Sequence, residues 1–254
     1  MKLVFLDTES TGTEEKDRLC QVAYSVMDDY VTRVDRSVVE YYKPPLPISI
    51  EAMSVHHITN DFVADKPAFI GSEAFNDLKS LFANYDCTMI AHNAKFDVGM
   101  LEREGIKPKK HICTLKLARH LDKEAKLPKY NLQYLRYLLD LKVEGEAHDA
   151  QGDVNVLIEL YKRLAAKVVE ENGTPFPTLA DAVDTMASIS SRPSLIRRFV
   201  FGKHNGKLVE DVAKTDRDYL RWLLEQKKVD SKEEEDWIYT LNHYLNGQQT
   251  APTG

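Results

Sequence analysis

Five residues of the sequence carry side chains that could together bind divalent metal and move a proton. His148 and Asp153 stand five residues apart where a helical pattern begins, Asp7 and Glu9 follow the apolar run LVFL, and Asp97 follows TMIAHNAKF. Carboxylates are ligands of Mg²⁺ and Mn²⁺, and an imidazole titrates near neutral pH, so it can act as a general base. Taken singly, a His or Asp at a helix start is usually a solvated cap. Together, the five predict a metal site with a base beside it.

The ligand types indicate which metal and which reaction. Cys20, Cys87 and Cys113 are widely spaced and form no CxxC pair, so neither a disulfide framework nor a zinc site is indicated. A carboxylate cluster suits a hard ion. Two such ions, about 3.5 to 4 Å apart, can activate a water and stabilise the leaving oxygen of an in-line displacement. The sequence therefore favours phosphoryl transfer with two Mg²⁺ ions, for which Mn²⁺ could substitute.

Length and composition set the class of protein. With 254 residues, of which 43% are hydrophobic and 29% charged, the chain can form one sizeable core and a small second unit. The apolar run before Asp7 is too short for a secretion signal, and no later segment approaches a membrane span. We expect a cytoplasmic protein without a membrane partner.

Charge is distributed unevenly. The formal net charge of −6 argues against a nucleic-acid binder that uses its whole surface. Residues 107–129 nevertheless contain eight Lys or Arg against two acids, and residues 190–207 contain five against none. These basic runs are either solvated faces or local sites for a polyanion.

The patterns predict a mixed sheet that delivers these side chains to one place. Residues 2–6, 19–27 and 31–42 indicate an antiparallel three-stranded start, and 88–92 with 94–104 indicate a strand followed by a helix. Another helix follows His148. Because Asp7 and Glu9 are two residues apart on an extended chain, both carboxylates can face one ion.

The segment GTPFPT is the best linker in the sequence. It sets the expected boundaries: a first domain at 1–172, a linker with a short helix at 173–190, a small C-terminal domain at 191–247 and a frayed tail at 248–254. In the C-terminal domain we expect a hairpin around His204-Asn205-Gly206, followed by two helices. Trp222 and Trp237 are expected in its core.

Three motifs in this order resemble those of the DEDDh family of 3′ to 5′ exonucleases. LDTESTG supplies Asp7 and Glu9, AHNAKFD supplies Asp97, and HDAQGD supplies His148 and Asp153. The resemblance implies an α/β, ribonuclease H-like mixed sheet flanked by helices, with a small C-terminal α+β appendage. It also implies that Asp7 bridges both metals, that Glu9 and Asp153 help hold the ion bearing the nucleophilic water, that Asp97 serves the second ion, and that His148 is the base.

Further segments, among them CTLKLARHL, FVFGKHNGK and DRDYLRWLL, are similar to the exonuclease X branch of that family. This similarity implies release of nucleoside 5′-monophosphates from DNA 3′ ends, on single strands or frayed duplexes, and a part in DNA repair. An RNA exonuclease of the same superfamily remains an alternative, because one 2′-hydroxyl contact separates the two substrates. So does a binding module on an inactive nuclease fold, which usually loses a metal carboxylate or the histidine. The sequence gives no indication of a protein partner.

The substrate contacts follow from the same resemblance and from the basic runs. The candidates are Thr8, Thr11, Gly12, His92, Asn93, Phe96, Arg197, Arg198, Lys203 and Lys207. Asn93 could equally cap the following helix. Many relatives have an apolar residue after the glycine of the first motif, but here Thr13 and Glu14 follow Gly12. The adjacent His56 and His57 are interpreted as a helix end and not as a metal pair.

Overall fold

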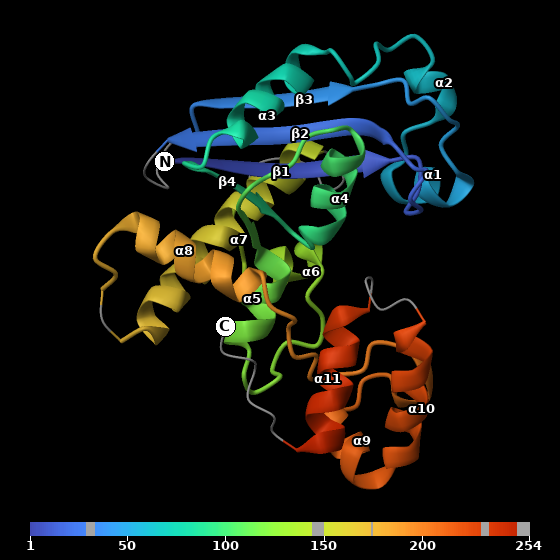
Figure 1. Cartoon of the computed structure of the whole chain (residues 1–254), viewed down its shortest axis with the longest axis vertical. Helices are drawn as coiled ribbons and strands as arrows, with labels where there is room; N and C mark the ends of the chain where they lie inside the picture. Colours follow the sequence, from blue (N-terminus) through green and yellow to red (C-terminus); the bar gives the residue numbers. More distant parts are fainter. Residues whose placement is uncertain (29–33, 144–149, 174, 230–233, 248–254) are drawn as a thin grey trace. The chain divides into compact units, whose positions relative to one another are not determined.

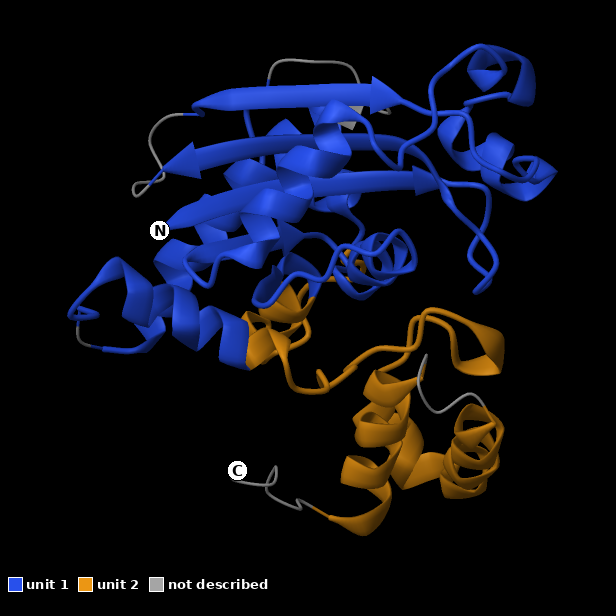
Figure 2. Cartoon of the chain, turned by 45° about the horizontal axis from the view of Figure 1, so that its top comes forward, with its two compact units in different colours: residues 1–115, 131–188 blue, residues 116–130, 189–254 orange. Residues whose placement is uncertain are grey.

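The computed structural model describes residues 1–28, 34–143, 150–173, 175–229 and 234–247. They divide into two compact units, shown in Figure 2: residues 1–115 with 131–188, and residues 116–130 with 189–254. The predicted boundary after residue 172 is not where the units divide, because helix α8 (Leu179–Ser190) lies almost entirely in the first unit. None of the described helices is long and apolar enough to cross a membrane.

A five-stranded mixed sheet forms the centre of the first unit (Figure 1). Its strands are β1 (Lys2–Ser10), β2 (Leu19–Asp28), β3 (Arg36–Tyr41), β4 (Cys87–Ala91) and β5 (His111–Cys113), in the order β3-β2-β1-β4-β5. β1 pairs antiparallel with β2, and β2 with β3, whereas β4 runs parallel to both β1 and β5. The predicted mixed sheet is confirmed. β5 was not predicted, because three residues are too few for a recognisable pattern.

Helices cover both faces of this sheet. α3 (Glu73–Ala83) and α4 (Lys95–Arg103) pack on one face and α7 (Ala150–Glu171) on the other, and α6 (Leu132–Leu138) packs on α7. The short helices α1 (Ile50–His56) and α2 (Asn60–Val63) follow β3 in the chain, and α5 (Thr114–Leu121) belongs mostly to the second unit. Leu6 of β1 belongs to the core that contains α3 and α4, whereas the ring of the neighbouring Phe5 meets Tyr161 of α7 edge to face, with centroids 5.4 Å apart. Successive side chains of β1 thus enter opposite layers, which holds the strand rigidly.

The second unit is helical in its described part. The 3₁₀ turn η1 (Gly202–His204) is followed by α9 (Val209–Thr215), α10 (Arg217–Lys228) and α11 (Glu235–Asn246). The three helices enclose a hydrophobic core that contains Phe199 and Trp237. The rings of these two residues stack with their centroids 5.3 Å apart. Segment 116–130 is attached to α11 through an ion pair of 2.6 Å between Arg119 and Asp236. This attachment explains why a segment far away in sequence belongs to the unit.

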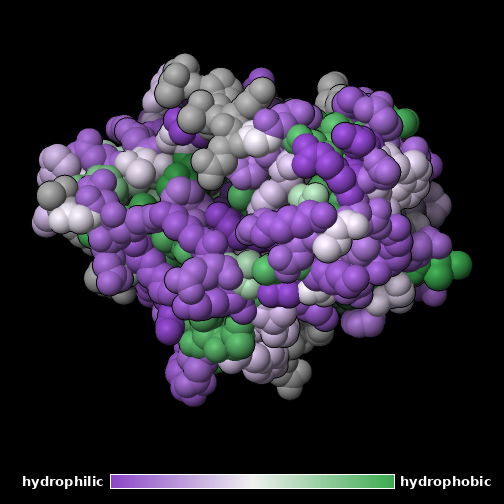
Figure 3. Space-filling view, turned by 90° about the horizontal axis from the view of Figure 1, so that it is seen from below, coloured by the Kyte–Doolittle hydropathy of each residue, from purple (hydrophilic) through white to green (hydrophobic). Residues whose placement is uncertain are grey.

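Two expectations for this unit need correction. The hairpin around His204-Asn205-Gly206 is present only in short form: Arg198 and Leu208 form an antiparallel bridge, backbone hydrogen bonds join Phe199 to Gly206 and Lys207, and the chain then turns into α9 instead of continuing as a strand. Trp222 on α10 is 55% exposed, whereas Trp237 is buried as predicted. The surface in Figure 3 is mostly hydrophilic, with small and separate hydrophobic patches.

Candidate active site

β1 positions the first two carboxylates. Asp7 pairs with Ala23 and Glu9 with Gln21 in the antiparallel ladder with β2, so the strand is extended at both positions. Their side chains therefore project from one face of the sheet, as predicted. Both residues are partly buried. The fully buried run before Asp7 fixes this end of the strand.

α4 positions the third carboxylate. Asp97 lies in the first turn of α4 and is only 3% exposed. The Thr8 hydroxyl donates a hydrogen bond of 2.8 Å to Asp97 Oδ1. This bond connects α4 directly to β1, so Thr8, a candidate for substrate contact, orients a carboxylate of the site.

α7 positions the fourth carboxylate. Asp153 lies in the first turn of α7, and Nε2 of Gln133, in the first turn of α6, donates a hydrogen bond to Asp153 Oδ1. His148 lies outside the described residues. Gln133 was not predicted, because nothing in the sequence indicates which residue of α6 faces α7.

The carboxylates share one electrostatic environment. Burial raises the pKa of Asp7 well above its ordinary value, and the charges of Asp97, Glu9 and Asp153 raise it further. Burial, followed by the charge of Asp153, raises the pKa of Glu9 to about 7. Burial likewise raises the pKa of Asp97 to about 7, although the Thr8 hydrogen bond opposes this. The site thus concentrates negative charge that a cation would neutralise.

The donor chemistry fits a hard divalent cation. The four carboxylates offer only oxygen, the ligand that Mg²⁺ and Mn²⁺ prefer. Among the residues that the structure describes, no three His, Cys, Asp or Glu side chains already lie close enough to hold one ion between them. Like charges repel, and Asp97 and Asp153 are hydrogen-bonded to the neutral side chains of Thr8 and Gln133.

The loop after β1 is closed around Asp17. The Thr11 hydroxyl donates to Asp17 Oδ1 at 2.6 Å, and the Glu14 amide donates to Oδ2 at 2.7 Å. A Cβ atom at Gly12 would lie 2.6 Å from Asp17 Oδ2, so this position accepts only glycine without rearrangement. Sequence reasoning missed Asp17, although an acid inside a run of turn residues is a recognisable signal.

α1 is attached to the same loop. His56 Nδ1 accepts a hydrogen bond from the Ile58 amide, so Nε2 carries the proton and donates to the Ser10 carbonyl at 3.1 Å. Burial lowers the pKa of His56, which favours this neutral form. The helix ends at His56, and His57 caps it with φ of 61°. The interpretation of the pair as a helix end is confirmed.

The remaining candidates in the first unit lie where β4 meets α4. His92 Nδ1 is hydrogen-bonded to Thr114 Oγ1 at 2.9 Å, and Phe96 packs against the core. Asn93 has φ of 63°, and the cap position of α4 is occupied by Ala94 without a side-chain hydrogen bond. The cap interpretation of Asn93 is therefore wrong.

The basic candidates all lie in the second unit. Arg197 donates to the Arg119 carbonyl at 2.9 Å, and Arg198 donates to the carbonyls of Gly206 and Ala125 at 2.6 and 3.1 Å. Lys203 pairs with Asp216 at 2.7 Å and is 59% exposed. Lys207 is exposed. The two arginines and Lys203 thus have structural partners, and Lys207 faces solvent.

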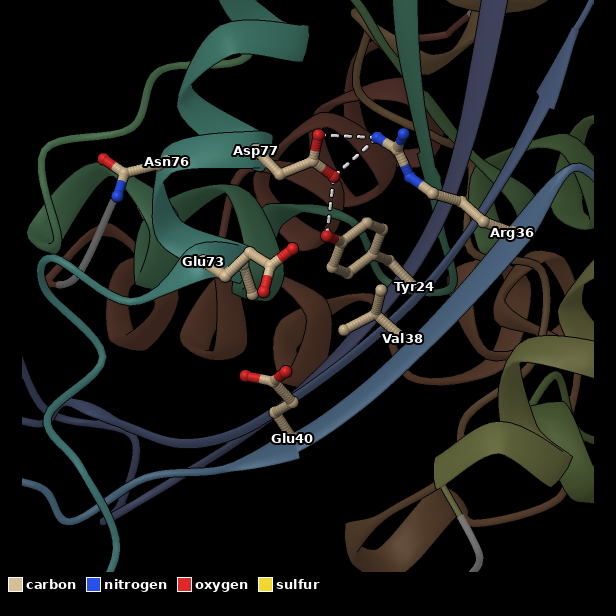
Figure 4. A pocket seen from close by; sticks show the side chains of 8 residues that line it. Tyr24, Arg36, Val38, Glu40, Glu73, Asn76 and Asp77 are labelled. Atoms are coloured by element: carbon tan, nitrogen blue, oxygen red, sulfur yellow. Dashed lines mark hydrogen bonds and ion pairs between the residues drawn. The ribbon is translucent and has the colours of Figure 1, made fainter.

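A pocket of about 630 Å³ lies between β2, β3 and α3 (Figure 4). Arg36 and Tyr24 both point to Asp77, which accepts hydrogen bonds of 2.6 Å from Arg36 and 2.7 Å from Tyr24. Its other acidic residues are Glu40 and Glu73. None of the predicted site residues lines it, and its excess of carboxylates does not suit a phosphate ligand.

Comparison with known proteins decides the family. Residues 4–161, which include the four carboxylates, match the family model described as Exonuclease, and residues 199–228 match that described as Exodeoxyribonuclease X-like C-terminal. Exodeoxyribonuclease 10 of Escherichia coli is 34% identical over 251 residues, covering 96% of this chain and 98% of the relative. The chain belongs to this exonuclease family. It is therefore a 3′ to 5′ exonuclease, as the three motifs predict.

Other relatives and solved structures match over a smaller share of this chain. DNA polymerase III subunit epsilon of Treponema pallidum is 29% identical over 174 residues, covering 66% of this chain and 78% of the relative. The structure of exonuclease X in complex with 5′ overhanging duplex DNA covers 74% of this chain and 99% of its own, with 27% identity and a TM-score of 0.55. E. coli exonuclease I in complex with a dT13 oligonucleotide shares the fold, with a TM-score of 0.56 at 21% identity, over 67% of this chain and 43% of its own.

Proposed function

We propose that this exonuclease is a divalent-metal-dependent exodeoxyribonuclease. It hydrolyses the last phosphodiester bond at a DNA 3′ end and releases a nucleoside 5′-monophosphate, as a step of DNA repair. The name of the E. coli relative and the DNA in the exonuclease X complex support DNA as the substrate. The observation that carries the proposal is the match to exodeoxyribonuclease 10 over 96% of the chain, together with the placement of four carboxylates on β1, α4 and α7, of which Asp97 is tied to β1 by the Thr8 hydrogen bond of 2.8 Å.

The four carboxylates would hold the metal. Asp7 would contact both ions, Glu9 and Asp153 would complete one site, and Asp97 would complete the other. Two bound Mg²⁺ ions would supply activation of the attacking water and stabilisation of the leaving 3′ oxygen. Thr8 and Gln133 keep two of these carboxylates in fixed orientations through their hydrogen bonds.

His148 would act as the general base. We assign this role to it because it stands five residues before Asp153 in the sequence, two residues before the start of α7. A neutral imidazole accepts the proton of the attacking water and afterwards returns it to solvent.

The closed loop at Thr11 and Gly12, together with His92, Asn93 and Phe96, would hold the terminal nucleotide. Lys207 would attract the phosphates of the strand, and Lys203 would add to this only by exchanging its ion pair with Asp216 for a phosphate. A single strand, or the frayed end of a duplex, is the expected form of the substrate. RNA differs only by its 2′-hydroxyls, so the two nucleic acids must be compared directly.

The test uses 5′-labelled DNA and RNA oligonucleotides of the same base sequence, each incubated with Mg²⁺, Mn²⁺ or EDTA. We expect stepwise shortening of DNA from its 3′ end with either metal and none with EDTA. The Asp7→Asn variant controls for contaminating nucleases. Equal cleavage in EDTA would overturn the metal-dependent mechanism, and faster cleavage of RNA would overturn the DNA assignment.

A further inference from the structure

Two helices meet at the fourth carboxylate of the site. α6 begins at Leu132 and packs on α7, and its Leu135 is fully buried. Gln133 and Asp153 lie in the first turns of the two helices, and Gln133 Nε2 donates its hydrogen bond to Asp153 Oδ1. The contact is thus held by the packing of both helices, and not by one flexible side chain alone.

The chemistry of the pair fixes the orientation of the glutamine amide. An ionised carboxylate only accepts hydrogen bonds, so the nitrogen of Gln133 must face Asp153. Gln133 Oε1 is then a buried acceptor for which the described part of the chain offers no hydrogen-bond partner. Because a buried acceptor costs free energy unless it receives a proton donor, this oxygen is suited to a water molecule beside the carboxylate.

The neutral character of Gln133 matters for a cation site. A Lys or Arg in this place would orient Asp153 equally well, but its charge would compete with a metal ion for the carboxylate. An amide orients the carboxylate and leaves its charge available. Thr8 stands in the same relation to Asp97, with a hydrogen bond of 2.8 Å.

We propose that Gln133 is a positioning residue that holds Asp153 for metal binding and accepts a hydrogen bond from a water in the site. This inference rests on the proposed metal-dependent function. A partner that orients a metal-binding side chain typically accounts for about 10- to 100-fold in metal affinity. Gln133 would act on the rate only through Asp153 and the water, without touching the substrate.

The test replaces Gln133 by Met, which is similar in length and lacks the amide. We expect the Gln133→Met variant to bind Mg²⁺ or Mn²⁺ alone about 10- to 100-fold more weakly in calorimetric titrations without DNA. The Mg²⁺ concentration for half-maximal activity should rise in proportion, while kcat at saturating Mg²⁺ falls less. The melting temperature in EDTA should stay close to that of the wild type. Tyr137→Phe, on the exposed side of the same helix, is the matched control. It should change neither the calorimetric metal affinity nor the Mg²⁺ concentration for half-maximal activity.

The outcomes separate this inference from the proposed function. If the wild type binds no divalent ion and digests DNA in EDTA, the proposed function fails. If the wild type binds the ion and Gln133→Met binds it with equal affinity, Gln133 is not a positioning residue. Should Gln133→Met not fold, Gln133→Ala replaces it, because alanine removes the amide and suits a helix. The same loss of affinity is expected for it, and wild-type affinity would overturn the inference.

Discussion

Burial is the main cause of the raised pKa values of Glu9 and Asp97. The charges of neighbouring carboxylates raise both pKa values further. The folded protein therefore binds protons there that the unfolded chain releases at lower pH. For an acid with a raised pKa, the stabilising contribution is present below the pKa of the unfolded chain, near 4, and is lost as the pH rises through the folded value, near 7. The residues that would hold metal thus weaken the fold at neutral pH when no metal is bound.

This argument predicts how the stability of metal-free protein depends on pH. In EDTA, the melting temperature should fall as the pH is raised from about 5 to about 8, and Glu9→Gln or Asp97→Asn should reduce the fall. With saturating Mg²⁺, the melting temperature should depend less on pH. Differential scanning fluorimetry at constant ionic strength measures it, with the exposed Glu73→Gln as control. A melting temperature that rises with pH over this range would contradict the assignment.

Removal of single metal-binding carboxylates should separate activity from stability. Asp7→Ala or Asp153→Ala should abolish hydrolysis, because the remaining carboxylates cannot hold both ions. The melting temperature in EDTA should hold or rise, since each change removes like-charge repulsion. Turnover of a labelled oligonucleotide and thermal unfolding measure the two effects. A variant with near-normal turnover in Mg²⁺ would falsify the two-ion assignment.

His148 should act on the rate and its pH dependence. If His148 is the base, His148→Ala should lower kcat by about 10²- to 10⁴-fold and shift or remove the acid limb of the pH profile. Calorimetric binding of Mg²⁺ should change little, because the four carboxylates stay in place. A normal rate together with an unchanged profile would exclude His148 from the mechanism.

At the scale of elements, the sequence predicted those parts that local pattern determines. Asp7, Glu9 and Asp97 could be located because an apolar strand or a helix start stands beside each of them. The C-terminal hairpin is shorter than predicted, because KLVEDV was interpreted as its second strand, whereas Val209 already begins α9 and its buried side chain packs in the second unit. The contact of Gln133 with Asp153 depends on how α6 packs on α7, which no local pattern contains.

The loop after β1 offers a test at this scale. Gly12→Ala should destabilise the protein by about 1 to 3 kcal/mol, because its Cβ would displace the Asp17 carboxylate that closes the loop. KM for DNA should rise if the loop holds the terminal nucleotide. Urea unfolding and steady-state kinetics measure both effects. Gly99→Ala is the control: its Cβ meets nothing within 4 Å, and alanine favours the helix, so stability should hold or rise slightly. Unchanged stability of Gly12→Ala would show that the loop adapts freely.

At the scale of the whole molecule, the chain joins a negatively charged nuclease site to a unit with a basic segment. Residues 191–229 contain ten Lys or Arg against five Asp or Glu, although the chain carries a net charge of −6. The unit cannot simply be cut off, since Arg119 in segment 116–130 depends on Asp236 of α11 for its ion pair. A truncation would leave these groups unpaired and would change folding along with binding.

Single charge reversals therefore test whether the second unit attracts DNA. Lys207 is exposed, and Lys207→Glu should weaken binding of a single-stranded oligonucleotide and lower the slope of log affinity against log salt by about 1. Cleavage of a very short substrate should stay unchanged, because such a substrate needs only the carboxylate site. Lys214→Glu is the matched control, since Lys214 is equally exposed but is neutralised by Glu210 at 2.6 Å. The contrary outcome has two parts: Lys207→Glu keeps the affinity and salt slope of the wild type, and Arg198→Ala lowers the melting temperature. The basic segment would then stabilise the fold of its own unit, and DNA would bind elsewhere.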